Sequence, residues 1–86
     1  MRIDKFLKVS RLIKRRAVAK DACDAGRVEI NGKTAKAGSD VQFGDLICIH
    51  FGSSDLTVKV LEIKDTTKKL DAEGMYEIVS TDSKTE

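Results

Sequence analysis

The apolar residues of this chain follow two different periods, and the change falls at Gly26. Before it, Ile3, Phe6 and Leu7 show the i, i+3, i+4 spacing of an amphipathic helix. After it, apolar and polar residues alternate, as they do in half-buried strands. Helices followed by strands predict an α+β domain, in which two short N-terminal helices pack on a small antiparallel β-sheet.

The first half of the chain predicts two short helices, over residues 2–9 and 15–25. Gly26 is expected to end the second helix, because a positive φ costs glycine least. Leu12 and Ile13 lie between the helices and are expected to pin this joint to the core. The second helix has a stripe of small residues, which allow close helix–helix approach and are expected to be buried: Val18, Ala19, Ala22 and Cys23.

The second half predicts strands joined by tight turns. Residues 27–30 alternate in polarity, and Asn31–Gly32 after them is the strongest short signal for a hairpin. Residues 33–36 would form its return strand, and Gly44–Asp45 marks another turn. The remaining segments are predicted as strands at 46–51, 56–63 and 75–79, with a polar loop at 65–74 that has room for one helical turn.

A chain of 86 residues suits one small domain, expected over residues 1–80 and followed by a disordered acidic tail at 81–86. Cys23 and Cys48 are isolated from each other and from any histidine cluster, so we expect buried apolar thiols in a reducing cytoplasm. The sequence has neither a signal-peptide pattern nor a window near the ~18 apolar residues that span a bilayer. A cytoplasmic location is therefore expected.

The net charge of +2 conceals an uneven distribution along the chain. Residues 1–36 contain 11 Lys and Arg against 4 Asp and Glu, whereas residues 37–86 contain 5 against 10. A localised basic region of this kind favours a polyanionic partner. A solvated helical surface without a partner is the simpler interpretation of the same charges.

An enzymatic function is disfavoured by the residues. The chain has one histidine, His50, with no nucleophile beside it in sequence, and its carboxylates form no evident pair. Phosphate-binding glycine loops and metalloprotease motifs are absent from the sequence. We therefore expect a non-catalytic protein without metal or cofactor.

The basic residues are concentrated where the two helices meet. Arg15 and Arg16 begin the second helix, where the helix dipole disfavours cations, so their position is better explained by a bound phosphate. Because aromatic residues do not interleave with these cations, a structured RNA is favoured over a stacked single strand. The candidate RNA-binding residues are Arg2, Lys5, Arg11, Lys14, Arg15, Arg16 and Lys20, extended by Lys33 and Lys36.

Two other binding functions fit parts of this pattern. Two helices separated by a turn are superficially similar to a DNA-binding helix-turn-helix, although strands follow at once and no third helix is evident. A protein-interaction adaptor would use the sheet and keep its basic residues for solubility.

The segments "MRIDKFL" and "KRRAVAKDACDAGRVEINGKTAK" resemble the alpha-L motif, the RNA-binding domain first known in small-subunit ribosomal protein number four. The resemblance covers residues 1 to about 51, and Arg15 stands where that family usually has a capping Ser or Thr. It implies RNA binding by the basic residues of the helices. The motif positions are filled by Arg2, Asp4, Arg16, Ala19, Gly26, Val28, Asn31 and Gly32.

Within this family, "KVSRLIKRRAVAKD", "LTVKVLEIKD" and "MYE" resemble the bacterial fifteen-kilodalton heat-shock protein group. The short form of the chain, with "RLIKRR" and "KDTTKK", is most similar to the Firmicutes P-site factors of ribosome-associated quality control. Such factors bind rRNA and peptidyl-tRNA on stalled large subunits. They stabilise the P-site tRNA while a partner that recruits alanyl-tRNA adds a C-terminal alanine tail.

The resemblance also ranks the residues. It makes Arg2 and Arg16 the first candidates for rRNA phosphates, with Lys5, Lys14, Arg15 and Lys20 second, and Asp4 a structural residue that orients a nearby Arg. A monomer is expected. The alternatives are recycling of obstructed large subunits, as in the heat-shock relative, or an RNA-targeting module of an RNA-modifying enzyme.

Overall fold

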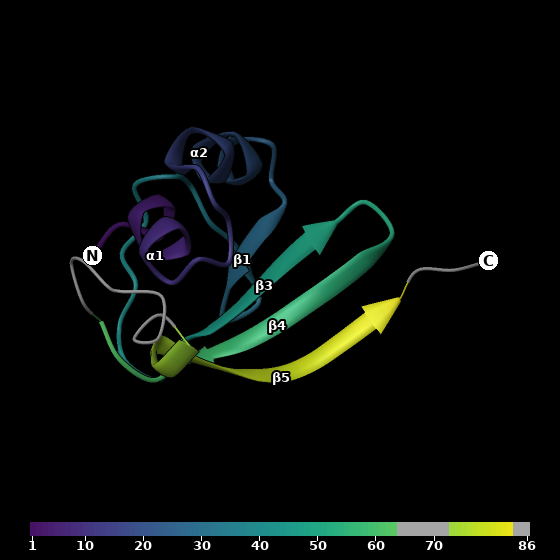
Figure 1. The fold of residues 1–86 in the computed structure, drawn as a ribbon. Coiled ribbons are helices and arrows are strands. Elements are labelled where there is room, and N and C mark those ends of the chain that lie inside the picture. Colours follow the sequence, from purple (N-terminus) through teal and green to yellow (C-terminus); the bar gives the residue numbers. More distant parts are fainter. Residues whose placement is uncertain (64–72, 84–86) are drawn as a thin grey trace.

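The computed structural model describes residues 1–63 and 73–83. Two helices are followed by five strands in one antiparallel sheet of order β2-β1-β3-β4-β5, which confirms the α+β prediction (Figure 1). The elements are α1 (Ile3–Val9), α2 (Arg16–Asp24), β1 (Val28–Ile30), β2 (Lys33–Thr34), β3 (Leu46–Phe51), β4 (Ser54–Val60), the 3-10 helix η1 (Glu73–Met75) and β5 (Tyr76–Ser83).

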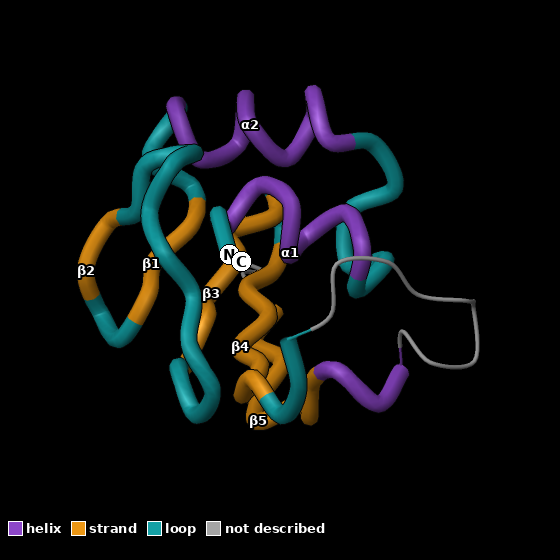
Figure 2. Tube along the Cα trace, turned by 90° about the vertical axis from the view of Figure 1, so that its left-hand side faces the viewer, coloured by secondary structure: helices purple, strands orange, loops and turns teal. Residues whose placement is uncertain are grey.

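The helices cover one end of one face of the sheet. In Figure 2, α1 lies between α2 and the strands, while Figure 1 shows β3, β4 and β5 extending past both helices. Ile47 and Ile49 of β3 alternate with more exposed neighbours and are buried beneath the helices together with Phe6 of α1. In the described part of the chain, no helix has the length and apolar character needed to cross a membrane.

The Asn31–Gly32 hairpin is present as predicted. Asn31 has φ 53° and Gly32 has φ 82°, the pair of positive values that a two-residue hairpin of this type requires. The Asn31 side chain also donates to Asp45 Oδ1 (3.1 Å) and accepts from the Leu46 N–H (2.9 Å). The hairpin is thereby fastened to the start of β3. Its return strand ends at Thr34 instead of residue 36, because the chain then leaves the sheet to contact α1.

Cys23 is a fully buried core residue, as expected. Burial, with smaller contributions from the carboxylates of Asp4 and Asp24, raises the pKa of the Cys23 thiol to about 11. The thiol is therefore protonated at neutral pH and behaves as a small apolar side chain. Cys48 differs from the prediction, because it lies on the outer face of the sheet and is only partly buried.

Three predictions about the helix stripe and the C-terminal half are wrong in detail. Val18 is 50% exposed, since only Ala19 and Cys23 of the predicted stripe face α1 and the sheet directly. Strand β4 ends at Val60 instead of residue 63, because the next two backbone N–H groups donate to Met75 O. Residues 81–83 continue β5, so the tail predicted at 81–86 is wrong for them. The other residues of that tail and positions 65–72 of the predicted loop lie outside the described residues.

Strand β5 is the long free edge of the sheet and contains a register shift. Thr57 pairs with Ser80, but the next residue, Val58, pairs with Ile78, which leaves Val79 as the extra residue. Ile78 is 58% exposed and Val79 is 54% exposed. A bulge of this kind bends a strand and interrupts its ladder of hydrogen bonds.

Candidate nucleic-acid interface

A buried carboxylate lies between the two helices. The Asp4 side chain is 4% exposed, and its Oδ1 accepts the Lys5 backbone N–H at 2.7 Å. Arg2 Nη2 donates to Asp4 Oδ2 at 3.2 Å, and Arg16 Nη2 donates to Asp4 Oδ1 at 3.4 Å. One carboxylate therefore holds the two arginines that the family resemblance ranks first, and the two come from different helices.

Arg2 is the N-cap residue of α1, and its guanidinium lies beside the loop formed by residues 36–39. A Cβ on Gly38 would lie 4.0 Å from Arg2 Cζ, so the guanidinium passes close to that backbone. The same loop closes the start of α1, because Ser39 O and Ala37 O accept the N–H groups of Ile3 and Asp4. Lys36 begins this loop, and its N–H donates to Ser39 Oγ at 2.9 Å.

The start of α2 differs from that of α1. The N-cap residue is Arg15, whose side chain, like that of Arg2, makes no capping hydrogen bond. The difference is that loop carbonyls accept the first N–H groups of α1, whereas no such loop bond is found at the start of α2 among the described residues. Lys14, Arg15 and Arg16 are all exposed around this helix start, and Lys20 lies one turn further along. A helix start with free N–H groups and three neighbouring cations is suited to an anion.

The joint between the helices turns sharply at a strained residue. Arg11 has φ 62°, a conformation that non-glycine residues rarely adopt. Ser10 before it is buried, and Ile13 after it is 9% exposed and donates its N–H to Leu7 O at 3.0 Å. Leu12 packs partly against the core. The joint is thus pinned by apolar residues, as predicted, and holds Arg11 and Lys14 outward.

Replacing Arg11 with Gly is expected to change the free energy of unfolding by less than about 1 kcal/mol. Glycine adopts the left-handed conformation without strain, and this gain offsets the larger backbone entropy that a glycine loses on folding. The same change removes one cation, so affinity for RNA is expected to fall. Urea denaturation and RNA titration measure the two effects separately. Arg11→Val is the contrasting variant, since a β-branched residue tolerates this φ poorly and is expected to destabilise the domain.

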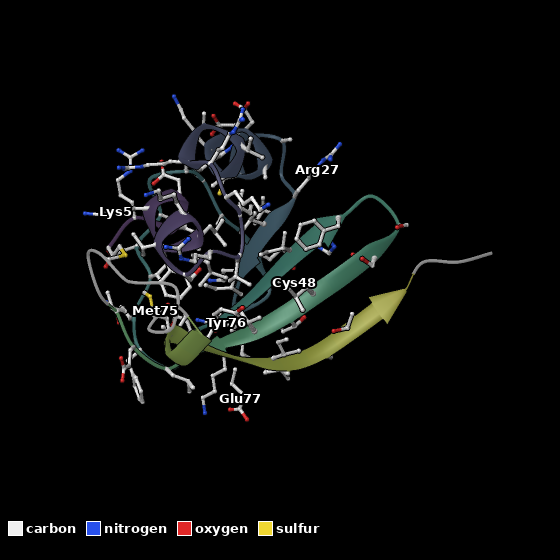
Figure 3. All side chains as sticks on the ribbon, viewed as in Figure 1. Lys5, Arg27, Cys48, Met75, Tyr76 and Glu77 are labelled. Carbon is white, nitrogen blue, oxygen red and sulfur yellow. The ribbon has the colours of Figure 1, made fainter. Side chains whose placement is uncertain are left out.

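The remaining candidate residues do not all join this cluster. Figure 3 shows Lys5 projecting at one side of the helices and Arg27, which was not a candidate, at the other. Lys33 is exposed beside the β1–β2 turn, which Figure 2 shows at the end of the hairpin away from α2. The other candidate residues lie on or next to the two helices: Arg2, Lys5, Arg11, Lys14, Arg15, Arg16, Lys20 and Lys36.

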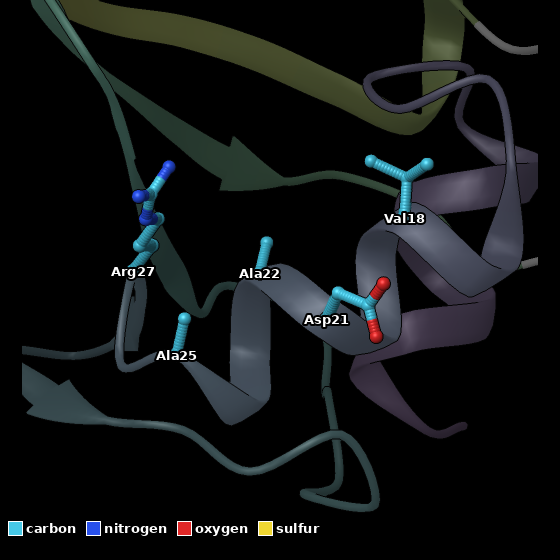
Figure 4. A pocket seen from close by; sticks show the side chains of 5 residues that line it. All are labelled: Val18, Asp21, Ala22, Ala25 and Arg27. Carbon is cyan, nitrogen blue, oxygen red and sulfur yellow. The ribbon is translucent and has the colours of Figure 1, made fainter.

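A shallow pocket of about 310 Å³ lies on another flank of α2. Figure 4 shows Val18, Ala22 and Ala25 projecting from one side of the helix, with Asp21 beside them and Arg27 beyond the helix end. The exposure of Val18 is thus explained by its position at this pocket instead of in the core. The pocket lining is mainly apolar, and its two charged residues, Asp21 and Arg27, have opposite signs.

Residues that the sequence did not single out gather around His50 on the outer face of the sheet. His50 Nε2 lies 2.5 Å from Glu29 Oε2, and His50 Nδ1 lies 2.8 Å from Asp55 Oδ1. Hydrogen bonding to Glu29, then to Asp55, raises the pKa of His50 above its ordinary value of 6.5. The sequence could have indicated Asp55, because Asp55 pairs with His50 across the predicted β3–β4 hairpin. The contact with Glu29 depends instead on the pairing of β1 with β3. No metal-binding cluster is found among residues 1–63 and 73–83.

The chain is similar to known proteins over most of its length. Residues 1–47 match the S4 domain family. The RQC P-site tRNA stabilizing factor of Streptococcus pneumoniae is 59% identical over 80 residues, covering 93% of this chain and 91% of that protein. The protein of the same name from Bacillus subtilis is 60% identical over 79 residues, covering 92% of each.

A solved structure gives the same result for the fold. The trimeric structure of Vibrio cholerae Heat Shock Protein 15 superposes with a TM-score of 0.85 at 28% identity, covering 93% of this chain and 82% of that one. Both resemblances inferred from the sequence motifs are confirmed. The chain belongs to the S4-domain family, in the group that includes the RQC P-site tRNA stabilizing factors.

Proposed function

We propose that this protein is a non-catalytic RNA-binding factor of bacterial ribosome-associated quality control, located in the cytoplasm on ribosomes. In this proposal it binds rRNA and peptidyl-tRNA on stalled large subunits. It stabilises the tRNA in the P site while a partner that recruits alanyl-tRNA extends the nascent chain with alanine.

The observation that supports this proposal most strongly is the pairing of Arg2 and Arg16 on one buried carboxylate, beside the uncapped start of α2. The arrangement offers forked donors and helix N–H groups to a phosphate. Its position within residues 1–47 coincides with the S4 domain match, and the relatives named as P-site tRNA stabilizing factors cover more than 90% of the chain.

In this proposal the residues have graded roles. Arg2 and Arg16 contact rRNA phosphates directly, and Lys5, Lys14, Arg15 and Lys20 add contacts around them. Arg11 and Lys36 extend the same surface, whereas Lys33 makes a separate contact at the hairpin. The P-site tRNA and the alanyl-tRNA-recruiting protein are further partners of the bound monomer.

A second candidate function is recycling of obstructed large subunits. It is favoured by the fold shared with Vibrio cholerae Heat Shock Protein 15. The two functions differ in their products. Purified large subunits carrying peptidyl-tRNA, the tailing partner and charged tRNA should yield alanine-extended chains in a factor-dependent manner under the first proposal only.

Arg16→Ala is expected to weaken binding to large subunits carrying peptidyl-tRNA about tenfold or more, because a charge-assisted contact is lost. Co-sedimentation on sucrose gradients measures the bound fraction. Repeating the measurement across salt concentrations should show a log–log slope shallower by about one for the variant, since one phosphate contact is missing.

Arg27→Ala provides the matched control, because it removes an equally charged, exposed side chain on the far side of the helices. It is expected to sediment like the original protein. Equal binding by the Arg16 variant and the original protein would overturn the site. A shallow salt slope for the original protein would instead favour the adaptor function.

A further inference from the structure

Three large apolar side chains are presented to water at one end of the sheet. Phe43 is the most exposed large apolar side chain in the described part of the chain, at 73%. Leu46 is 42% exposed, and Ile63, which follows β4, is 39% exposed. The two segments that carry them lie side by side, because the backbone of Val60 exchanges two hydrogen bonds of 2.9 Å with the turn at residues 44–45.

The turn that carries Phe43 is held by several hydrogen bonds. Asp45 accepts the Gln42 N–H on its Oδ2 at 2.9 Å and donates its own N–H to Gln42 O at 3.1 Å. Its Oδ1 accepts from Asn31 Nδ2 at 3.1 Å, which ties the turn to the β1–β2 hairpin. Gly44 supplies the positive φ of 86° that the turn requires. Phe43 is thus fixed at its backbone, so little further order is needed when its ring is buried by a partner.

The surroundings of Phe43 are negatively charged. Residues 40–46 and 60–63 contain three carboxylates and neither Lys nor Arg. One of the three, Asp40, is paired with the Met1 ammonium at 2.8 Å, which leaves the two segments with a net negative charge. Figure 1 shows these segments, coloured teal and green, close together at the lower left, at the end of the molecule away from α2. Such a surface repels RNA and complements a cationic protein surface.

We infer that Phe43 anchors the chain to a second protein of the stalled large-subunit complex, by inserting its ring into an apolar pocket bordered by Lys and Arg. The inference rests on the proposed function and adds a protein contact to the RNA contacts of the helices. A buried aromatic ring surrounded by side chains that exclude water is the usual anchor of a protein interface. Leu46 and Ile63 exclude water around the ring, and Glu62 pairs with a cation at the border of the pocket.

Phe43→Ala is expected to weaken binding to the complete complex about tenfold or more, because the anchor is lost. The complex is assembled from purified large subunits carrying peptidyl-tRNA and the alanyl-tRNA-recruiting protein, and co-sedimentation measures the bound fraction. Phe43→Leu keeps an apolar side chain and is expected to retain part of the affinity. Phe51→Ala is the matched control, because Phe51 is a 40% exposed aromatic residue at the other end of β3, and it is expected to bind like the original protein.

A change of charge separates a protein partner from RNA. Glu62→Gln removes one negative charge from the exposed surface near Phe43. A cationic partner predicts binding that is weaker by about two- to fivefold, the effect of losing one exposed ion pair. Asp24→Asn removes an equal charge from the exposed end of α2 and is expected to bind as tightly as the original protein or more tightly. Tighter or unchanged binding by Glu62→Gln would overturn the cationic border.

Photocrosslinking identifies the occupant directly. A photoreactive benzoylphenylalanine in place of Phe43 is expected to crosslink to a protein of the purified complex, at a site that mass spectrometry maps to an apolar pocket bordered by Lys or Arg. The same substitution at Phe51 is the control and is expected to leave that site unlabelled. A crosslink to rRNA or tRNA, a crosslink to a second copy of this chain, or no crosslink at all would overturn the inference.

The outcomes also distinguish this inference from the proposed function. Failure of the original protein to bind large subunits carrying peptidyl-tRNA would overturn the proposed function and the anchor with it. Binding by the original protein, with equal binding by Phe43→Ala, would overturn the anchor alone. Urea denaturation shows that each variant is folded, as expected for side chains at exposed positions.

Discussion

Replacing Phe6 with Ala is expected to lower the free energy of unfolding by about 3–5 kcal/mol. Phe6 is fully buried and is the largest side chain of the core, where α1 packs with the strands and α2. Truncation removes its transfer free energy and leaves a cavity that a small core closes only partly. Native proteins have a total stability of about 5–15 kcal/mol, so the substitution removes a large fraction of it.

Urea denaturation followed by circular dichroism measures this effect. Phe43→Ala is the control, because the same atoms are removed from a side chain that is 73% exposed. That variant is expected to change stability by less than about 0.5 kcal/mol. Equal losses from the two variants would contradict the position of Phe6 at the centre of the core.

The second large effect is a pH dependence that originates at His50. Both ring nitrogens face carboxylate oxygens, Nε2 at Glu29 and Nδ1 at Asp55, so the cationic ring donates two hydrogen bonds that join β1, β3 and β4. Glu29, then Asp55, raises the pKa of His50 in the folded state above 6.5. The resulting stabilisation is complete below pH 6.5, and it is lost as the pH rises through the raised pKa.

His50→Gln is expected to remove this pH dependence and to lower stability by about 2 kcal/mol at pH values below the ordinary histidine pKa. The difference in urea midpoint between the two proteins, followed against pH, isolates the histidine from other titrating groups. His50 is the single histidine of the chain, so its ring resonances also report the pKa directly by NMR. A difference that grows with pH would contradict the assignment.

The parts of the fold that depend on neighbouring residues were predictable from the sequence. Helix α1 followed from the spacing of Ile3, Phe6 and Leu7, and the β1–β2 hairpin followed from Asn31–Gly32. The pairing of Asp4 with an arginine was expected from the family resemblance. Sharing of one carboxylate by two arginines depends on how α1 and α2 cross, which local patterns do not specify.

The features that were missed depend on long-range pairing. Glu29 lies 21 residues before His50, and their contact requires the register of β1 on β3. The final part of β5 was predicted as a tail because Thr81, Asp82 and Ser83 have no apolar signal of their own. They are ordered as a strand because β4 supplies the backbone partners. Val18 was assigned to the core because a period alone does not fix the width of the buried face.

The register shift in β5 has a consequence for solubility. An eight-residue strand at the open edge of a sheet, with Ile78 and Val79 more than half exposed, would ordinarily be a template for aggregation. The extra residue at Val79 breaks the regular spacing of outward backbone donors and acceptors, so a second chain cannot extend the sheet along its full length. The bulge therefore opposes edge-to-edge pairing at the point where the edge strand exposes its two apolar residues, Ile78 and Val79.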